Sequence, residues 1–274
     1  MKKFEGVLIC TDLDGTLLKN DKSISRENSE AIEYFKAEGG KFTFVTGRMP
    51  YFSEAARDMV KPNAPIGCIN GGGIYDFEEG KYVCAEILPR EALDLVEYAL
   101  ANIKGMGVSV YTFERIYFSA ENSAMEEFRK ATGVANAVMP YRDITLPIAK
   151  IVFGDENLKS KEKLATILNE HPMAKDFDFV SSERTLYEIL PKGVNKGAVL
   201  PKLSAYLGID SSRTIAIGDY NNDIPMLKAA ALGIAVANAC PEAKAAADYV
   251  TVSNEEHAIA RIISGLENGE IKFS

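Results

Sequence analysis

The chain has 274 residues, a length that permits one large domain or two smaller ones. Its composition, with 47% hydrophobic and 26% charged residues, is ordinary for a globular protein. The formal net charge of −8 argues against nucleic acid or a membrane surface as the main partner. An acidic protein that binds an anionic substrate must therefore create positive potential locally, with a metal ion or a few placed cations.

The cysteines and the N-terminal segment bear on the compartment. Cys10, Cys68, Cys84 and Cys240 form no CxxC pair, and their spacing predicts structural thiols rather than a zinc site. The apolar run at residues 7–10 follows two lysines but is too short for the core of a signal peptide. No apolar stretch approaches the ~18 residues of a membrane span. We therefore expect a cytoplasmic protein.

Short apolar runs alternate with helical patterns at the start of the chain. Residues 7–12 form a short run rich in branched side chains, which is typical of a buried strand. A helix is predicted next, with Ser25 as its N-cap. Residues 41–46 then predict a second strand and residues 66–70 a third.

The middle of the chain has a different pattern. Strands and helices are mixed there, which predicts an inserted α/β domain over residues 86–189. Its first element is an amphipathic helix after Pro89. The remaining predicted elements are strands at residues 108–113, 115–119, 149–153 and 177–181, and helices near residues 124–132 and 161–170.

The C-terminal part returns to the pattern of the start. Residues 214–219 and 233–237 predict two further strands, again separated by helical segments. Strands that alternate with helices in this way indicate a parallel sheet covered on both faces. We therefore expect an α/β protein with a doubly wound, Rossmann-like core made of residues 1–85 and 190–274.

Polar residues follow three of the predicted core strands. Asp12 and Asp14 lie two positions apart at the end of the first strand, so both carboxylates can face one site. Residues 46–48, Thr-Gly-Arg, end the second strand, and Asp219 ends a later one. In a doubly wound sheet, ligands bind outside the carboxyl ends of the strands. These residues are therefore expected at one edge.

The predicted site is rich in oxygen ligands. Residues 218–223, Gly-Asp-Tyr-Asn-Asn-Asp, add further carboxylate and amide groups to it. Crowded carboxylates repel one another unless a cation lies between them. A hard cation with oxygen ligands suggests Mg²⁺.

Lys196 is the candidate cation for a phosphate. It lies near the N-terminus of a predicted helix, where a positive charge is unfavourable for the helix but suits an anion site. Lys192 is a rival, although its place before Gly193 favours a solvated loop. Pro201 falls some five residues into the helix if that helix begins at Lys196, so either the helix is kinked or it begins later.

Together these motifs resemble the haloacid dehalogenase superfamily. They are DLDGT at residues 12–16, VTGR at 45–48, KG at 196–197 and GDxxND at 218–223. The large insert resembles the α/β cap of the Cof-like phosphatases. The resemblance covers the core from end to end, whereas the cap matches in position and general pattern. It implies a core with an inserted cap that selects the substrate.

The resemblance also implies a mechanism. The protein would be a Mg²⁺-dependent phosphatase that hydrolyses phosphate monoesters of small metabolites, such as sugar phosphates, through an aspartyl-phosphate. Asp12 would be the nucleophile and Asp14 the acid and base. Mg²⁺ would be held by Asp12, Asp219 and Asp223 and by the main-chain carbonyl of Asp14. The loop of residues 15–25 would be a mobile flap.

Further residues are candidates for binding the substrate. Those that the resemblance places on the transferring phosphate are Leu13, Thr46, Gly47, Lys196 and Asn222. Asn70 either contacts substrate or makes a turn, and the three glycines at residues 71–73 lack GxGxxG spacing and predict a turn. The other candidate substrate contacts are Arg48, Arg115, Arg184 and Glu188.

Two alternatives remain open. A phosphomutase or phosphotransferase would use the same core and pass the phosphoryl group to a hydroxyl of a sugar instead of water. A non-catalytic binding protein on this fold is disfavoured, because Asp12, Asp14 and Asp219 are all present. The oligomeric state stays open.

Overall fold

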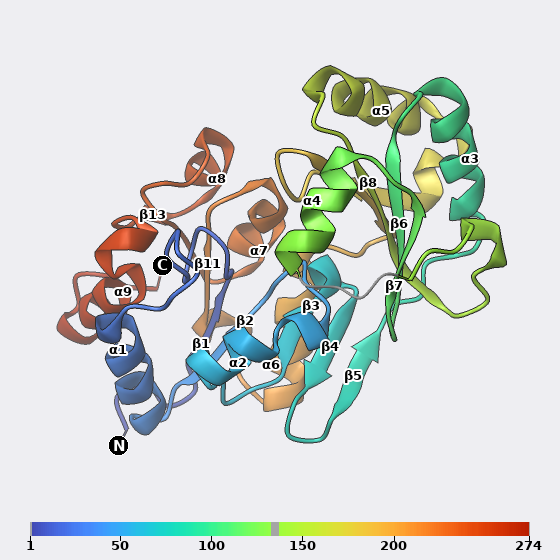
Figure 1. Ribbon diagram of the computed structural model, residues 1–274. Coiled ribbons are helices and arrows are strands. Elements are labelled where there is room, and N and C mark those ends of the chain that lie inside the picture. Colours follow the sequence, from blue (N-terminus) through green and yellow to red (C-terminus); the bar gives the residue numbers. More distant parts are fainter. Residues whose placement is uncertain (1, 133–136, 274) are drawn as a thin grey trace. The chain divides into compact units, whose positions relative to one another are not determined.

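The computed structural model describes residues 2–132 and 137–273 (Figure 1). Contacts divide the chain into two compact units, Met1–Cys84 with Asn195–Ser274, and Ala85–Val194. The second unit contains residues 86–189, the range expected for the cap, and continues for five residues beyond it. Among the described residues, no helix is long and apolar enough to cross a membrane.

The first unit is built on a five-stranded sheet of order β13-β12-β11-β1-β2, in which all neighbouring strands are parallel. This arrangement confirms the predicted doubly wound core. The strands are β1 (Leu8–Thr11), β2 (Lys41–Phe44), β11 (Thr214–Gly218), β12 (Leu232–Ala235) and β13 (Tyr249–Val250). The helices are α1 (Arg26–Ala37), α2 (Glu54–Val60), α6 (Val199–Leu207), α7 (Ile224–Ala229), α8 (Pro241–Ala246) and α9 (Ala258–Asn268).

Local chemistry accounts for the first of these elements. All four residues of β1 are buried, as expected for a strand covered on both faces. α1 begins at the predicted cap, where the Ser25 hydroxyl accepts a hydrogen bond from the Asn28 amide at 3.2 Å. Ile32 and Phe35 form its buried face. These expectations are therefore confirmed.

The third predicted strand is shorter than expected and belongs to another sheet. β3 (Ile66–Cys68) pairs antiparallel with β4 (Gly73–Asp76), and β5 (Lys81–Ala85) completes a sheet of order β3-β4-β5. The Thr46 amide donates to the Gly67 carbonyl at 3.0 Å, which keeps β3 beside the end of β2. The prediction is wrong beyond Cys68, because the chain leaves the extended conformation and forms the turn η2 (Ile69–Gly71), whose residues have positive φ values.

The second unit contains an antiparallel sheet of order β7-β6-β8-β10-β9. A hydrophobic core that includes Leu95, Ile151 and Leu164 joins this sheet to α3 and α5. The strands are β6 (Gly107–Thr112), β7 (Ile116–Ala120), β8 (Ile148–Gly154), β9 (Phe177–Val180) and β10 (Leu186–Pro191). The helices are α3 (Ala92–Asn102), α4 (Ser123–Thr132) and α5 (Leu158–Glu170).

The strand β10 was missing from the predicted elements. Its residue Glu188 is charged but buried, because Lys150 of β8 donates a hydrogen bond to it at 2.9 Å. An apolar pattern alone does not reveal a strand that carries a buried ion pair. Because β10 pairs with β8 and β9, the chain stays in the second unit through this strand.

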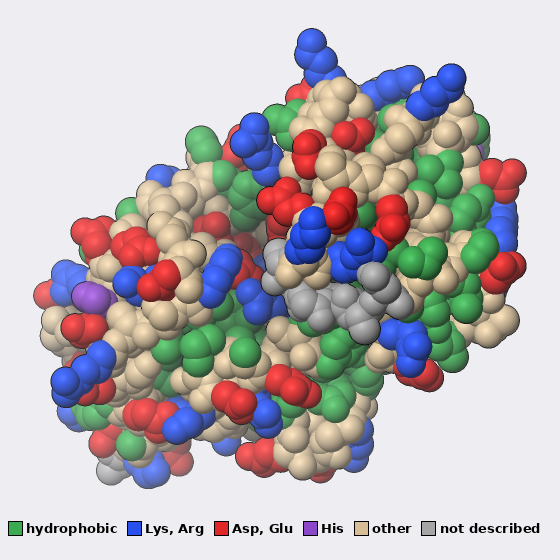
Figure 2. All heavy atoms as spheres, viewed as in Figure 1, with side chains coloured by type: hydrophobic (Ala, Val, Ile, Leu, Met, Phe, Trp, Pro, Cys, Tyr) green, Lys and Arg blue, Asp and Glu red, His purple; other side chains and the backbone are tan. Residues whose placement is uncertain are grey.

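Charged side chains are numerous on the face of the molecule shown in Figure 2. On the face shown in Figure 2, acidic and basic side chains of the described residues are interspersed.

The short helices that complete the fold lie in the connections between the longer elements. They are η1 (Pro50–Phe52), η3 (Tyr141–Asp143), η4 (Pro172–Asp176), η5 (Lys196–Ala198), η6 (Ser211–Arg213), η7 (Asn221–Asp223) and η8 (Asn254–Glu256).

Candidate active site

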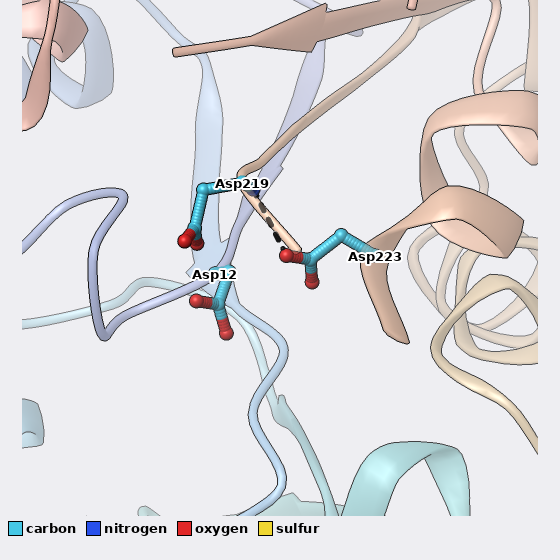
Figure 3. Close-up of side chains that lie close together, drawn as sticks. All are labelled: Asp12, Asp219 and Asp223. Atoms are coloured by element: carbon cyan, nitrogen blue, oxygen red, sulfur yellow. Dashed lines mark hydrogen bonds between the residues drawn. The ribbon is translucent and has the colours of Figure 1, made fainter. Parts of the chain in front are cut away.

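Three carboxylates lie together at the point where the order of the parallel sheet reverses. From β1 the chain moves to β2 on one side, and later to β11 on the other. Asp12 directly follows β1 and Asp219 directly follows β11, so both lie at the carboxyl ends of neighbouring strands. With Asp223 they form a group whose ligand oxygens all lie within 4.8 Å of one another (Figure 3).

Lys196 lies against two of these carboxylates. Its Nζ donates to Asp12 Oδ1 and to Asp223 Oδ1, each at 2.6 Å. The side chain is only 1% exposed. Burial lowers the pKa of the Lys196 ammonium, but the charges of Asp12 and Asp223 outweigh it and hold the pKa above its usual value. Lys196 is therefore held as a cation.

The start of α6 explains how Lys196 is presented. The Asn195 side chain caps η5 and accepts a hydrogen bond from the Ala198 amide at 3.1 Å. α6 then begins at Val199, which places Pro201 in its first turn, where no intrahelical bond is lost. The later of the two predicted helix starts is therefore the one observed. The rival Lys192 is exposed and donates to Asp178 at 2.8 Å.

The pKa of Asp12 is raised despite the contact of this residue with Lys196. Burial raises the pKa of the Asp12 carboxyl well above its usual range, against the opposing charge of Lys196. The neighbouring carboxylates Asp223 and Asp219 raise this pKa further. One ammonium group thus faces three clustered carboxylates, and a further cation would relieve the repulsion.

Asp223 shapes the loop that follows β11. Its Oδ2 accepts hydrogen bonds from the amides of Asp219 and Tyr220, each at 3.0 Å. Burial and the charge of Asp223 raise the pKa of Asp219 to about 6. Asp219 also accepts a hydrogen bond from the Thr16 hydroxyl at 2.7 Å. Gly15 packs so closely that a β-carbon there would lie 2.7 Å from Asp219 Oδ2.

The side chain of Asp14 is outside the group of three carboxylates. Arg48 donates to it from Nε at 3.0 Å and from Nη2 at 2.7 Å, and Lys22 donates at 2.9 Å. Burial raises the pKa of Asp14, but Arg48 and Lys22 outweigh it, so the pKa lies below its usual value. Arg48, a candidate substrate contact, is thus paired with the predicted acid and base.

Several of the predicted phosphate-binding residues lie around the same edge of the sheet. Thr46 follows β2 and is buried, and its hydroxyl accepts a hydrogen bond from the Arg48 amide at 3.3 Å. Asn222 lies in η7 beside the carboxylates, and its side chain donates to Asn70 at 3.1 Å. Leu13 has a fully buried side chain, which leaves its backbone as the part that could face a ligand.

Comparisons with known proteins bear directly on this site. The family model of the haloacid dehalogenase-like hydrolases matches residues 9–263. The chain belongs to this family. Its relatives include a 5-amino-6-(5-phospho-D-ribitylamino)uracil phosphatase of Bacillus subtilis, 30% identical over 286 residues, with 96% of this chain and 98% of the relative covered. Another B. subtilis phosphatase, YwpJ, is 28% identical over 290 residues, with 94% of this chain and 99% of the relative covered.

Solved structures give the same assignment. A haloacid dehalogenase-like hydrolase from Bacteroides thetaiotaomicron superposes with a TM-score of 0.81 at 26% identity, over 94% of this chain and 98% of that chain. The resemblance seen in the motifs is therefore confirmed, and so is the prediction of an enzyme. The chain is a phosphohydrolase of the haloacid dehalogenase type.

In this haloacid dehalogenase-like hydrolase, the predicted flap is tied down by residues that the motifs did not indicate. The Asn238 side chain donates to the Gly15 carbonyl at 2.7 Å, and the Asn254 side chain donates to the Leu18 carbonyl at 3.0 Å. Leu17 and Leu18 are buried. Only long-range packing reveals such contacts, because Asn254 is 236 residues away from Leu18 in the sequence.

The three candidate residues of the hydrolase's second unit are not alike. Arg115 and Arg184 are exposed, in the connections that precede β7 and β10. Glu188 is buried within the sheet and paired with Lys150. Sequence reasoning missed Lys150, since a lysine inside an apolar strand carries no signal for its partner 38 residues away.

Proposed function

We propose that this hydrolase is a Mg²⁺-dependent phosphatase that cleaves phosphate monoesters of small metabolites through an aspartyl-phosphate at Asp12. The observation that carries the proposal is the group formed by Asp12, Asp219 and Asp223 around Lys196. The phosphatases among its relatives support the reaction class, and one of them acts on a phosphorylated ribityl compound. We propose phosphates of sugars or similar metabolites as substrates.

The donor set fits magnesium. Asp12, Asp219 and Asp223 supply hard oxygen ligands, and burial together with the neighbouring carboxylates raises the pKa values of Asp12 and Asp219. We propose that these residues, with the main-chain carbonyl of Asp14, would hold the ion. When bound, Mg²⁺ would neutralise charge on the phosphate oxygens and on Asp12.

Asp12 acts as nucleophile in this proposal. Its carboxylate attacks the phosphorus and the bond to the leaving alkoxide breaks, which gives an acyl phosphate on Asp12. Asp14 supplies a proton to the alkoxide. A water molecule, deprotonated by Asp14, then attacks the acyl phosphate and releases inorganic phosphate. Because Arg48 and Lys22 hold the pKa of Asp14 below its usual value, Asp14 must leave these partners and take up a proton from solvent before it can protonate the leaving oxygen.

Other groups at the edge of the sheet would hold the transferring phosphoryl oxygens. We assign this role to Lys196, the side chains of Thr46 and Asn222, and the backbone of Leu13 and Gly47. Fixed donors of this kind act on the charge that develops in the transition state, and they need no reorganisation at that moment.

The free cysteines of the described chain suit a reducing compartment, so we propose that the reaction takes place in the cytoplasm.

The proposal is tested with p-nitrophenyl phosphate. We expect hydrolysis that requires Mg²⁺ and stops with excess chelator, and no turnover by Asp12→Asn. The matched control is Asp58→Asn, the same change at an exposed carboxylate, which should keep wild-type activity. Full activity of Asp12→Asn would contradict the mechanism. With a sugar phosphate in ¹⁸O-water, label in the released phosphate separates hydrolysis from transfer to another sugar.

A further inference from the structure

The turn after β3 has an unusual backbone. Three consecutive residues adopt the left-handed region, with φ values of +58° at Ile69, +52° at Asn70 and +99° at Gly71. A positive φ is ordinary for glycine and tolerated by asparagine, but for a β-branched residue such as isoleucine it is a genuine outlier. Such strain persists only where the surroundings impose it, and it occurs preferentially at functional sites.

Contacts on both sides impose this conformation. The Ile69 amide donates to the Arg48 carbonyl at 3.0 Å, and the Asn70 amide donates to the Thr46 carbonyl at 3.1 Å. On the other side, a β-carbon at Gly71 would lie 2.1 Å from the Asn195 carbonyl oxygen, so only glycine fits there. The turn therefore packs against residues 46–48 and against the segment that presents Lys196.

The Asn70 side chain lies between two groups assigned to the phosphate. It is 1% exposed, and its Oδ1 accepts the hydrogen bond from Asn222. The same amide packs on Gly47, where a β-carbon would lie 3.0 Å from Asn70 Oδ1 and 3.1 Å from its Nδ2. The amide of Asn70 thus sets the separation between the Gly47 backbone and the Asn222 side chain.

We propose that Asn70 is a positioning residue for phosphoryl transfer, held by the strained turn Ile69–Gly71 so that Gly47 and Asn222 receive the transferring oxygens in the correct arrangement. This inference rests on the proposed function. It resolves the two roles that the sequence left open for Asn70, because a residue that only fills a left-handed turn could be glycine. The buried amide, in contact with both partners, is what glycine would lack.

Asn70→Gly provides the test, because it keeps the backbone conformation accessible and removes only the side chain. With p-nitrophenyl phosphate and Mg²⁺, we expect kcat to fall roughly 10- to 100-fold with little change in KM, as misplacement of catalytic groups by about 1 Å does. Inhibition by orthovanadate, which mimics the transition state, should weaken more than inhibition by inorganic phosphate. The matched control is Lys61→Gly, at an exposed left-handed position, which should behave as wild type.

The outcomes separate the inference from the proposed function. An inactive wild-type enzyme would contradict the proposed function, whereas an active wild type with an equally active Asn70→Gly would overturn the inference alone. A parallel fall in vanadate and phosphate binding with kcat unchanged would also overturn it. If Asn70→Gly does not fold, Asn70→Ala removes the same amide and restricts the unfolded backbone more than glycine does. Wild-type kcat in a folded Asn70→Ala would then contradict the positioning role.

Discussion

The two units of the molecule bury charge in different ways. In the second unit, β8 and β10 carry one ammonium and one carboxylate, Lys150 and Glu188, which neutralise each other at 2.9 Å. At the edge of the parallel sheet, Lys196 contacts Asp12 and Asp223 while Asp219 lies beside them. The first arrangement is balanced, and the second has an excess of negative charge. A balanced pair can serve the fold, whereas an unbalanced group needs a further cation.

The largest expected effect comes from removing the cation of the unbalanced group. Lys196→Met leaves Asp12 and Asp223 buried without their ammonium partner. We expect the free energy of unfolding in chelator to fall by about 3–5 kcal/mol, the cost of breaking a buried charge pair. Excess Mg²⁺ should restore part of it, because the ion would supply the missing charge. Urea titration measures both values, and turnover should fall by roughly 10²–10³-fold.

Lys192→Met is the control for this change. Lys192 is 59% exposed and paired with Asp178, so its loss should cost at most about 1 kcal/mol. Equal free energies of unfolding in the two variants would show that the buried contacts of Lys196 do not stabilise the fold. The contrast between balanced and unbalanced buried charge would then be wrong.

The balanced pair should behave differently when both partners are replaced. Lys150→Met alone leaves Glu188 buried beside an apolar side chain, and we expect a loss of about 3 kcal/mol in the free energy of unfolding. The double variant Lys150→Met with Glu188→Leu should recover to within about 1 kcal/mol of the wild type, because apolar residues of similar volume replace a buried pair well. Urea titration of the four proteins completes a double-mutant cycle.

A double variant no more stable than the single one would show that the pair has a role beyond mutual neutralisation. No such recovery is expected for Asp12 with Lys196, because the remaining carboxylates would still repel each other. The comparison of the Lys150–Glu188 cycle with the corresponding cycle of Asp12 and Lys196 therefore measures the difference between a balanced and an unbalanced group.

The smallest expected effect is a dependence on pH. The pKa of Asp219 is raised to about 6 in the folded protein, whereas an unfolded aspartate titrates near 4. The folded state therefore binds more protons in this window, and stability without metal should fall as the pH rises from about 4 to about 6. In Asp219→Asn, this fall in stability with rising pH should be smaller. Urea titrations between pH 4 and 7 in chelator measure the free energy of unfolding of both proteins. If the comparison of the wild type with Asp219→Asn shows that Asp219 adds stability as the pH rises from about 4 to about 6, the expected sign is contradicted.

Much of the fold follows from patterns within short stretches of sequence. β1 and β11 are apolar runs of strand length, and Ser25 caps α1 as expected. Hydrophobic periodicity and capping act over a few residues, so they can be interpreted without knowledge of the fold. The hairpin of β4 and β5 was not predicted, and no residue of β5 is fully buried. The strand β10 was not predicted either, because Glu188 interrupts its apolar pattern.

The site shows the same division between local and long-range information. Asp12, Asp14 and Asp219 were predicted at strand ends, where the alternation of a strand and the geometry of a parallel sheet place them. Asp14, however, is paired with Arg48, and it lies in the turn beyond β1, which ends at Thr11. The alternation of the strand therefore does not extend to Asp14, and the sequence alone does not show where this turn directs the side chain.

The sequence by itself determined the parallel core, the inserted domain and the residue types that belong to a haloacid dehalogenase-like hydrolase. Only the tertiary structure decided which charges meet. Lys196 reaches Asp12 across 184 residues of sequence, and Asn70 reaches Asn222 across 152. Contacts of this kind depend on how strands and loops assemble, and no local propensity encodes a partner so far away in the chain.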